Sequence, residues 1–198
     1  MNSLRPAAAI TRLRRPLAFV CLAIVIGTAA RPSGAQFGGD PGTLERRVKA
    51  AFLYKFTGYV TWPDATFAGA DTSITIGVIG DDALAAELAR VVSGRTVDGR
   101  PLAVKRLQGE PLTGIHMLFI GRAENARLKH LIAPLQTRSV LIVTESERAL
   151  DQGSTINFLT ASGHVRFEIA LDAAKKRGLK LSSRLLTVAQ NVRTGTLP

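Results

Sequence analysis

The histidines of this sequence are the residues whose type is most often found at catalytic or metal-binding sites. His116, His130 and His164 lie far apart, and none has another His or a Cys at the spacing of a zinc site. The sequence contains no Gly-x-Ser-x-Gly elbow and no Ser-x-x-Lys motif, so it does not indicate a serine nucleophile beside its base. We therefore expect a protein that is not an enzyme and that needs no cofactor and no metal.

The acidic pair Asp81-Asp82 follows a predicted strand over residues 74–79. In a phosphorylation-receiver domain, acids at this point bind magnesium, but that site also needs an Asp at the end of a middle strand. The candidate strand here ends in Ile120-Gly121-Arg122, which contains no acid. We therefore expect Asp81 or Asp82 to cap the helix that follows.

The first predicted helix carries apolar residues at helical spacing from Leu44 to Tyr59. It is apolar around most of its circumference, so it must be covered by its own sheet and by a further element, for which a second copy of the chain is one candidate. Pro63 disfavours helical backbone at Trp62 and ends the helix. Lys55 interrupts the apolar stripe, so it either pairs with an acid or extends into solvent.

Strands and helices alternate through the middle of the chain. We expect strands over residues 74–79, 102–107, 115–120 and 140–143, separated in part by helices that carry Leu84–Val92 and Leu128–Ile132. This alternation predicts a single α/β domain with a mainly parallel sheet flanked by helices.

The C-terminal part predicts a β-hairpin followed by helices. Residues 154–159 and 164–169 alternate in polarity, with Gly163 at the turn between them. We expect a register that places Asn157 opposite Arg166 on the polar face of the hairpin.

Two helices are predicted after this hairpin. The first ends at Gly178, with Lys175-Lys176-Arg177 as a solvated basic end. Ser182 is expected to cap a last helix that includes Val192.

The formal net charge of +11 comes from 26 basic and 15 acidic residues, and it is concentrated at the start of the chain. Residues 1–35 hold five arginines and no acid, so 21 basic and 15 acidic residues remain, a net charge of +6. Basic residues, an apolar run over 17–30 and Ser33-Gly34-Ala35 predict a secretory signal peptide over 1–35. The apolar run has about 14 residues, which is short for a membrane-spanning helix. We expect a periplasmic protein that binds no nucleic acid.

This division predicts a flexible lead-in at 36–43, an α/β domain at 44–193 and a tail at 194–198. The only cysteine, Cys21, falls within the predicted signal peptide, so no intramolecular disulfide is expected in the exported protein.

Four segments, taken in order, resemble the YfiR-like family of periplasmic proteins over about residues 47–193. They are VKAAFLYKF with VTWP (48–63), INF (156–158), GHVRFEI (163–169) and GLKLSSRLL (178–186). The resemblance implies a non-enzymatic regulator that represses an inner-membrane diguanylate cyclase by binding its periplasmic portion, which limits cyclic di-GMP signalling and biofilm formation. It also implies an outer-membrane lipoprotein that sequesters the repressor.

Some members of the family that this chain resembles contain cysteines linked to redox-dependent folding, and the predicted mature chain has none, so we expect no redox control through its own thiols. A second interpretation of the sequence is a periplasmic small-molecule sensing module that reports to a histidine kinase or a transporter.

The resemblance also suggests contact residues for a partner. Phe52 and Phe56 are expected to lie in the core beneath the sheet. The candidate partner contacts are aromatic, polar and basic residues of the matched segments: Tyr54, Lys55, Trp62, Asn157, Arg166 and Arg184.

Overall fold

A computed structural model describes residues 41–109, 111–161 and 163–195. Its helices are α1 (Pro41–Thr57), α2 (Asp82–Val92), α3 (Leu128–Ile132), α4 (Leu171–Lys176) and α5 (Ser183–Val188). Its strands are β1 (Val60–Thr61), β2 (Ile74–Ile79), β3 (Thr96–Val97), β4 (Arg100–Leu107), β5 (Met117–Ile120), β6 (Leu141–Thr144), β7 (Ile156–Ala161), β8 (His164–Ala170), β9 (Lys180–Leu181) and β10 (Asn191–Arg193). Short 3-10 turns are η1 (Asp64–Thr66), η2 (Arg122–Arg127), η3 (Ala133–Leu135) and η4 (Ala149–Gln152).

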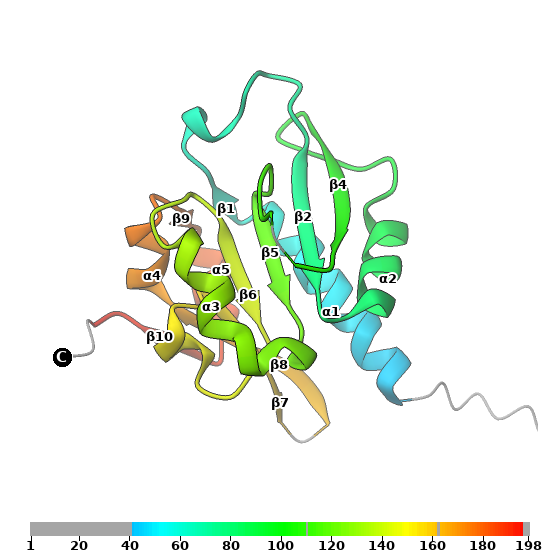
Figure 1. Cartoon of the computed structure of the whole chain (residues 1–198), viewed down its shortest axis with the longest axis vertical. Helices are drawn as coiled ribbons and strands as arrows, with labels where there is room; N and C mark the ends of the chain where they lie inside the picture. The colour runs from blue at the N-terminus through cyan, green and yellow to red at the C-terminus, as the bar shows by residue number, and fades with distance from the viewer. Residues whose placement is uncertain (1–40, 110, 162, 196–198) are drawn as a thin grey trace, which may run out of the picture. The chain divides into compact units, whose positions relative to one another are not determined.

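The main sheet has the strand order β10-β8-β7-β6-β5-β2-β4-β3 (Figure 1). Strands β4, β2, β5, β6 and β7 are parallel to one another, and β10 is parallel to β8, whereas β8 is antiparallel to β7 and β3 is antiparallel to β4. Strands β2, β5 and β6 are buried along their whole length, which explains their nearly continuous apolar sequences. The predicted α/β domain with a mainly parallel sheet is confirmed.

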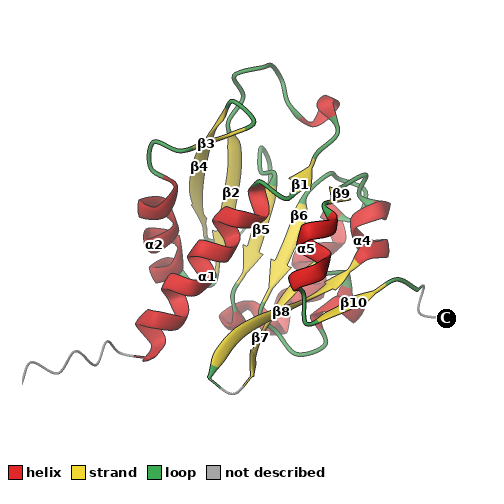
Figure 2. Ribbon diagram, turned by 180° about the vertical axis from the view of Figure 1, so that it is seen from behind, coloured by secondary structure: helices red, strands yellow, loops and turns green. Residues whose placement is uncertain are grey.

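Helices cover both faces of this sheet. On one face, α1, α2 and α5 share one buried apolar cluster with the sheet (Figure 2), and within this cluster the Phe56 and Phe167 ring centroids are 5.1 Å apart. Phe56 is buried in the core as predicted, and Phe52 is partly buried and packs against it. On the other face of the sheet, α3 packs against β5 and β6.

The second cover of α1 is α2. Leu53 of α1 belongs to the same buried cluster as Leu84 and Leu88 of α2, and Arg47 lies 4.0 Å from Glu87 across the two helices. A second copy of the chain is therefore not required to cover the apolar circumference of α1.

The hairpin β7–β8 is present, but the predicted register is wrong by two residues. Asn157 pairs with Glu168 and Arg166 pairs with Leu159, because Ala161 pairs with His164 and the turn lies one residue later than expected. Gly163 has φ +74°, as the predicted left-handed turn position requires. A shift of two residues leaves each side chain on its predicted face.

The last helix is shorter than predicted. Ser182 caps it as expected by accepting a hydrogen bond from the Leu185 amide (3.4 Å), but the helix ends at Val188. The amide of Gln190 then donates to the Phe167 carbonyl (2.8 Å), and β10 continues beside β8. Val192 is therefore in a strand, because the open edge of β8 offers backbone hydrogen bonds.

The ends of the predicted domain also need adjustment. Helix α1 begins at Pro41, so the last part of the expected lead-in is helical. The predicted signal peptide over 1–35, residues 36–40 and residues 196–198 lie outside the described residues. Lys175 and Lys176 are exposed as predicted, whereas Arg177 is buried, contrary to the prediction of a solvated basic end.

Candidate functional site

Tyr54 and Lys55 lie together near the end of α1, with Lys55 exposed and Tyr54 half-buried. The Arg95 guanidinium lies 4.9 Å from the centroid of the Tyr54 ring, and the Lys55 Nζ lies 5.6 Å from it. Arg95 Nη1 also donates to the Tyr54 hydroxyl (3.4 Å). Two cations beside one aromatic ring form cation–π contacts and leave a positive, partly aromatic surface.

A small groove of about 210 Å³ continues from this pair. It is lined by Tyr54, Lys55, Gly58, Tyr59 and Val97. Tyr59 is half-buried here and follows the tight turn that ends α1, in which the Gly58 amide donates to the Lys55 carbonyl (3.1 Å). We call the set Tyr54, Lys55, Tyr59, Arg95 and Val97 the α1 surface.

The small sheet β1–β9 connects this end of α1 to the start of α5. Thr61 pairs with Lys180, and the Ser182 amide donates to the Tyr59 carbonyl (2.9 Å). Arg184 is exposed two residues after Ser182. The fold thus places the start of α5, which carries Arg184, next to the turn that carries Tyr59.

Trp62 lies in the interior rather than on this surface. Its side chain is 6% exposed, and its Nε1 donates to the His116 carbonyl (3.0 Å). This bond fixes the segment after β1 against the start of β5, so the side chain of Trp62 has a structural role.

His116 is a buried imidazole with both nitrogens engaged. Its Nδ1 accepts a hydrogen bond from the Thr75 amide (3.0 Å), and the ring also bonds the Thr66 backbone. Burial lowers the pKa of His116, and the charges of Arg100 and Lys105 lower it further against the opposing Thr66 bond. A neutral ring fits this arrangement, because Nδ1 cannot accept a hydrogen bond when protonated.

An aromatic stack covers the same histidine. The Phe67 ring lies on the His116 ring at 4.7 Å, and the Arg100 guanidinium lies 3.9 Å from the centroid of Phe67. Arg100 Nη1 also donates to the carbonyls of Gly69 and Ala70 (both 2.7 Å). The stack thereby holds the loop after η1 against the sheet.

Asn157 is also buried and structural. Its Oδ1 accepts from the Thr144 hydroxyl (2.8 Å) and the Ser146 amide (3.1 Å), and its Nδ2 donates to Glu168 (3.0 Å). The side chain is 1% exposed, so it connects β6, β7 and β8 and presents almost no area to a partner.

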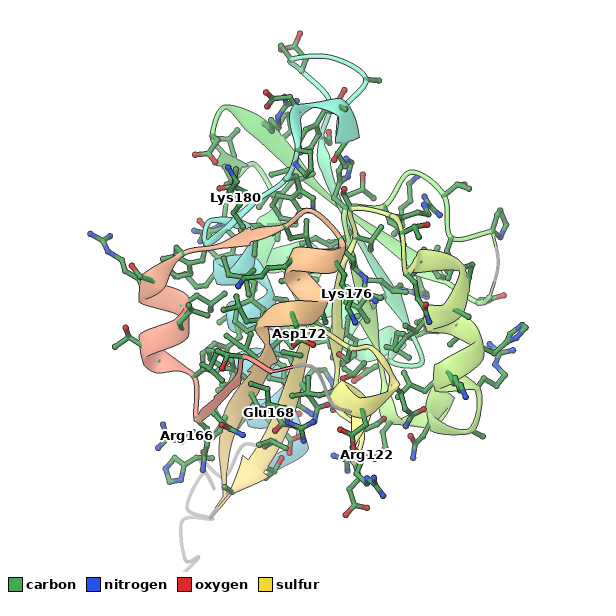
Figure 3. All side chains as sticks on the ribbon, turned by 90° about the vertical axis from the view of Figure 1, so that its left-hand side faces the viewer. Arg122, Arg166, Glu168, Asp172, Lys176 and Lys180 are labelled. Carbon is green, nitrogen blue, oxygen red and sulfur yellow. The ribbon has the colours of Figure 1, made fainter. Side chains whose placement is uncertain are left out.

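Arg166 lies on the exposed part of β8, near the end of the hairpin and beyond Glu168 (Figure 3). The structure therefore separates the six predicted contacts. Tyr54 and Lys55 are adjacent, Arg184 follows a segment bonded to the same turn, Arg166 lies on the hairpin, and Trp62 and Asn157 are internal.

Sequence reasoning missed Arg95 and Val97. Both follow α2, about forty residues after Tyr54 in the chain, and no periodicity links them to α1. The sequence pattern placed Tyr59 only in the apolar stripe of the first predicted helix and did not indicate a place on the α1 surface.

Open α/β folds usually bind ligands at the carboxyl ends of their strands, at the point where the strand order reverses. In this sheet that point lies between β2 and β5. Gly80 and Gly121 approach closely there, since a Cβ on Gly121 would come within 2.7 Å of the Gly80 carbonyl oxygen. Asp81 is the helix cap that the sequence predicted, accepting from the Leu84 amide (2.8 Å).

Within the described residues, no group of three His, Cys, Asp or Glu side chains is arranged to hold a metal ion.

These features define a small α/β domain with an exposed aromatic and basic surface. A comparison with family models matches the YfiR/HmsC-like family over residues 46–190. The chain belongs to the YfiR/HmsC-like family. This family is periplasmic and regulatory, and membership of it suggests a role in cyclic di-GMP signalling.

A solved structure described as a conserved domain protein from Vibrio cholerae O1 biovar El Tor strain N16961 is similar in fold, with a TM-score of 0.52 and 8% sequence identity. The match covers 75% of this chain and 60% of that chain. The comparison with curated proteins gave no match. Among the described residues, no helix combines the length and apolar character needed to cross a membrane.

Proposed function

We propose that this protein is a periplasmic regulator that represses an inner-membrane diguanylate cyclase by binding the periplasmic portion of the cyclase. The family match over residues 46–190 supports this proposal. An outer-membrane lipoprotein that sequesters the repressor would complete the regulatory cycle, and release of the cyclase would raise cyclic di-GMP and favour biofilm.

The α1 surface is the contact that we propose for the cyclase. Tyrosine and arginine are enriched among the residues that dominate binding energy at protein interfaces, and here Tyr54 and Arg95 are already stacked. Such preorganisation reduces the side-chain entropy lost on binding. The exposed Lys55 adds a charge that suits an acidic partner face.

The test combines a cellular and a biochemical measurement. Deletion of the gene should raise cellular cyclic di-GMP, and the wild-type protein should co-purify with a membrane cyclase. The variants Y54A and K55E should each weaken binding to that cyclase by about tenfold or more and fail to restore low cyclic di-GMP.

The matched control is K175E, which changes the same charge at an exposed position of α4. It should restore repression fully, and circular dichroism should show all three variants folded. Unchanged cyclic di-GMP after deletion, together with no cyclase among the captured proteins, would contradict the proposed function.

A further inference from the structure

A cavity of about 600 Å³ lies between η4, α4 and β10. Its lining differs entirely from the α1 surface and includes both basic and acidic side chains. The charged residues of the lining are Lys129, Asp151, Asp172, Lys176, Arg177 and Arg193.

Arg177 is the buried member of this set, with 4% of its surface exposed. Its Nη2 donates to the Gly153 carbonyl (2.8 Å) and its Nη1 to the Ala173 carbonyl (3.1 Å). Longer bonds of 3.4 Å reach the Thr155 hydroxyl and the Leu135 carbonyl. All four acceptors are neutral, and burial lowers the pKa of Arg177. Because a guanidinium has five N–H groups, one on Nη2 keeps no acceptor among the described residues.

The remaining charges of the cavity do not balance. Asp151 is occupied by two arginines, since it accepts from Arg193 (2.5 Å) and Arg148 (3.1 Å). Among the described residues, four charged side chains of the lining have no ion-pair partner within 4.0 Å: Lys129, Lys176, Arg177 and Asp172. Three cations against one acid leave a surplus of two positive charges around one cavity.

Two of these side chains are close in the fold. Asp172 and Lys176 lie one turn apart on α4 (Figure 3).

A buried cation without a counter-charge is costly, and an anion that enters the cavity would offset that cost. The remaining Nη2 N–H of Arg177 can donate one charge-assisted hydrogen bond to a carboxylate or phosphate oxygen.

We propose that this cavity binds a small oxyanion with two negative charges, of the class of phosphate and short dicarboxylates, with Arg177 as the buried anchor and Lys129 and Lys176 at the rim. The volume accommodates a metabolite of this size. Binding here would make the domain a sensor of such an anion, an activity that is separate from the contact with a cyclase.

Isothermal titration calorimetry of the purified protein tests the proposal, with inorganic phosphate, succinate and acetate as probes at constant ionic strength. We expect saturable binding of phosphate or succinate, and at least about tenfold weaker binding of the singly charged acetate. Saturation by phosphate alone identifies a phosphate ligand, and saturation by succinate alone identifies a dicarboxylate.

Substitutions at the rim test the location of the binding. K176Q should weaken binding about two- to fivefold, and D172N should strengthen it by a similar factor because a repelling charge is removed. K175Q is the matched control, since Lys175 is the neighbouring exposed lysine of α4 and does not line the cavity. K175Q should leave the affinity unchanged.

R177K should reduce the affinity by more than about tenfold, because lysine lacks the planar fork whose other N–H groups hold the side chain in place and direct the remaining Nη2 N–H at the anion. If R177K does not fold, K129Q and K176Q compared with K175Q decide the question. Absence of saturable binding by both phosphate and succinate overturns the proposal, and so does an equal loss in K175Q and K176Q. No cyclase is present in this assay, so its outcome is independent of the proposed regulatory function.

Discussion

His116 is a residue whose protonation is linked to folding. Its pKa is lowered, chiefly by burial, from the usual value of 6.5, so the unfolded chain takes up the proton first as the pH falls. The stability due to the neutral ring is complete above about pH 6.5 and is lost as the pH falls below that value. We expect the free energy of unfolding to decrease as the pH falls from about 6.5 toward the lowered pKa of the folded state, by at most about 1.4 kcal/mol per pH unit from this group.

The measurement is urea-induced unfolding at several pH values, for the wild type and for H116N. Asparagine retains an acceptor near the position of Nδ1 but does not titrate, so H116N should show a smaller loss of stability in acid. H130N, at an exposed position of α3, should behave as the wild type. If H116N keeps the full pH dependence, other groups cause it and the linkage to His116 is refuted.

Single residues were predictable from the sequence where local geometry alone determines their role. Asp81, Ser182, Gly163 and Gly178 fall in this class, because a helix cap or a left-handed turn depends only on nearby backbone. The buried state of Asn157 depends instead on strands that are distant in the chain, so no local pattern reports it.

Helix α1 is fixed to the sheet by a buried ion pair. Lys49 Nζ contacts the carboxylates of Glu45 and Glu145, and Glu145 also accepts from the Arg122 amide (2.9 Å). Removal of one member leaves the other charge buried, so we expect K49M to lower the free energy of unfolding by about 3 kcal/mol. Chemical denaturation followed by circular dichroism measures this loss.

The control for this prediction is K55M on the same helix. Lys55 is exposed and has no carboxylate partner within 4.0 Å among the described residues, so its replacement should change stability by less than about 0.5 kcal/mol. The double variant K49M/E145M should be less destabilised than the sum of its single variants. Strictly additive losses would show that the two side chains do not interact.

Helix α4 ends at Lys176, and the chain turns away at Gly178, which has φ +71°. A Cβ there would lie 3.4 Å from the Pro63 side chain, so G178A adds backbone strain and a close contact. We expect G178A to lower the free energy of unfolding by about 1–2 kcal/mol and G178N to cost less, since asparagine tolerates this conformation. Thermal unfolding compares the two, and an equal loss in both would mean that the contact with Pro63, rather than strain, is decisive.

Elements were predictable where their sequence pattern was long or fully apolar. The predicted strand over residues 74–79 matches β2, and the two segments of the hairpin were found although their register was not. Strand β10 was missed because its three residues form a strand only where β8 offers an open edge. Such short pairs depend on the tertiary fold and have no periodicity of their own.

At the scale of the whole molecule, the net charge of +6 expected for residues 36–198 bears on how the domain meets a partner. Long-range attraction by an acidic face accelerates association, and salt screens that attraction. Short-range stacking acts mainly after contact, so it determines how slowly the complex dissociates. The α1 surface contains both kinds of group, in Lys55 and Tyr54, and the two contributions are therefore separable.

Surface plasmon resonance against the periplasmic portion of the cyclase that we propose as partner should separate them. The association rate of the wild type should fall about tenfold between low and high salt, whereas K55E should associate slowly already at low salt and depend less on salt. Y54A should keep the association rate and its salt dependence but dissociate at least about tenfold faster, because it loses the ring stacked beneath Arg95. K175E removes the same charge from α4, so a loss of association rate equal to that of K55E would assign the attraction to the charge of the domain as a whole instead of to the α1 surface.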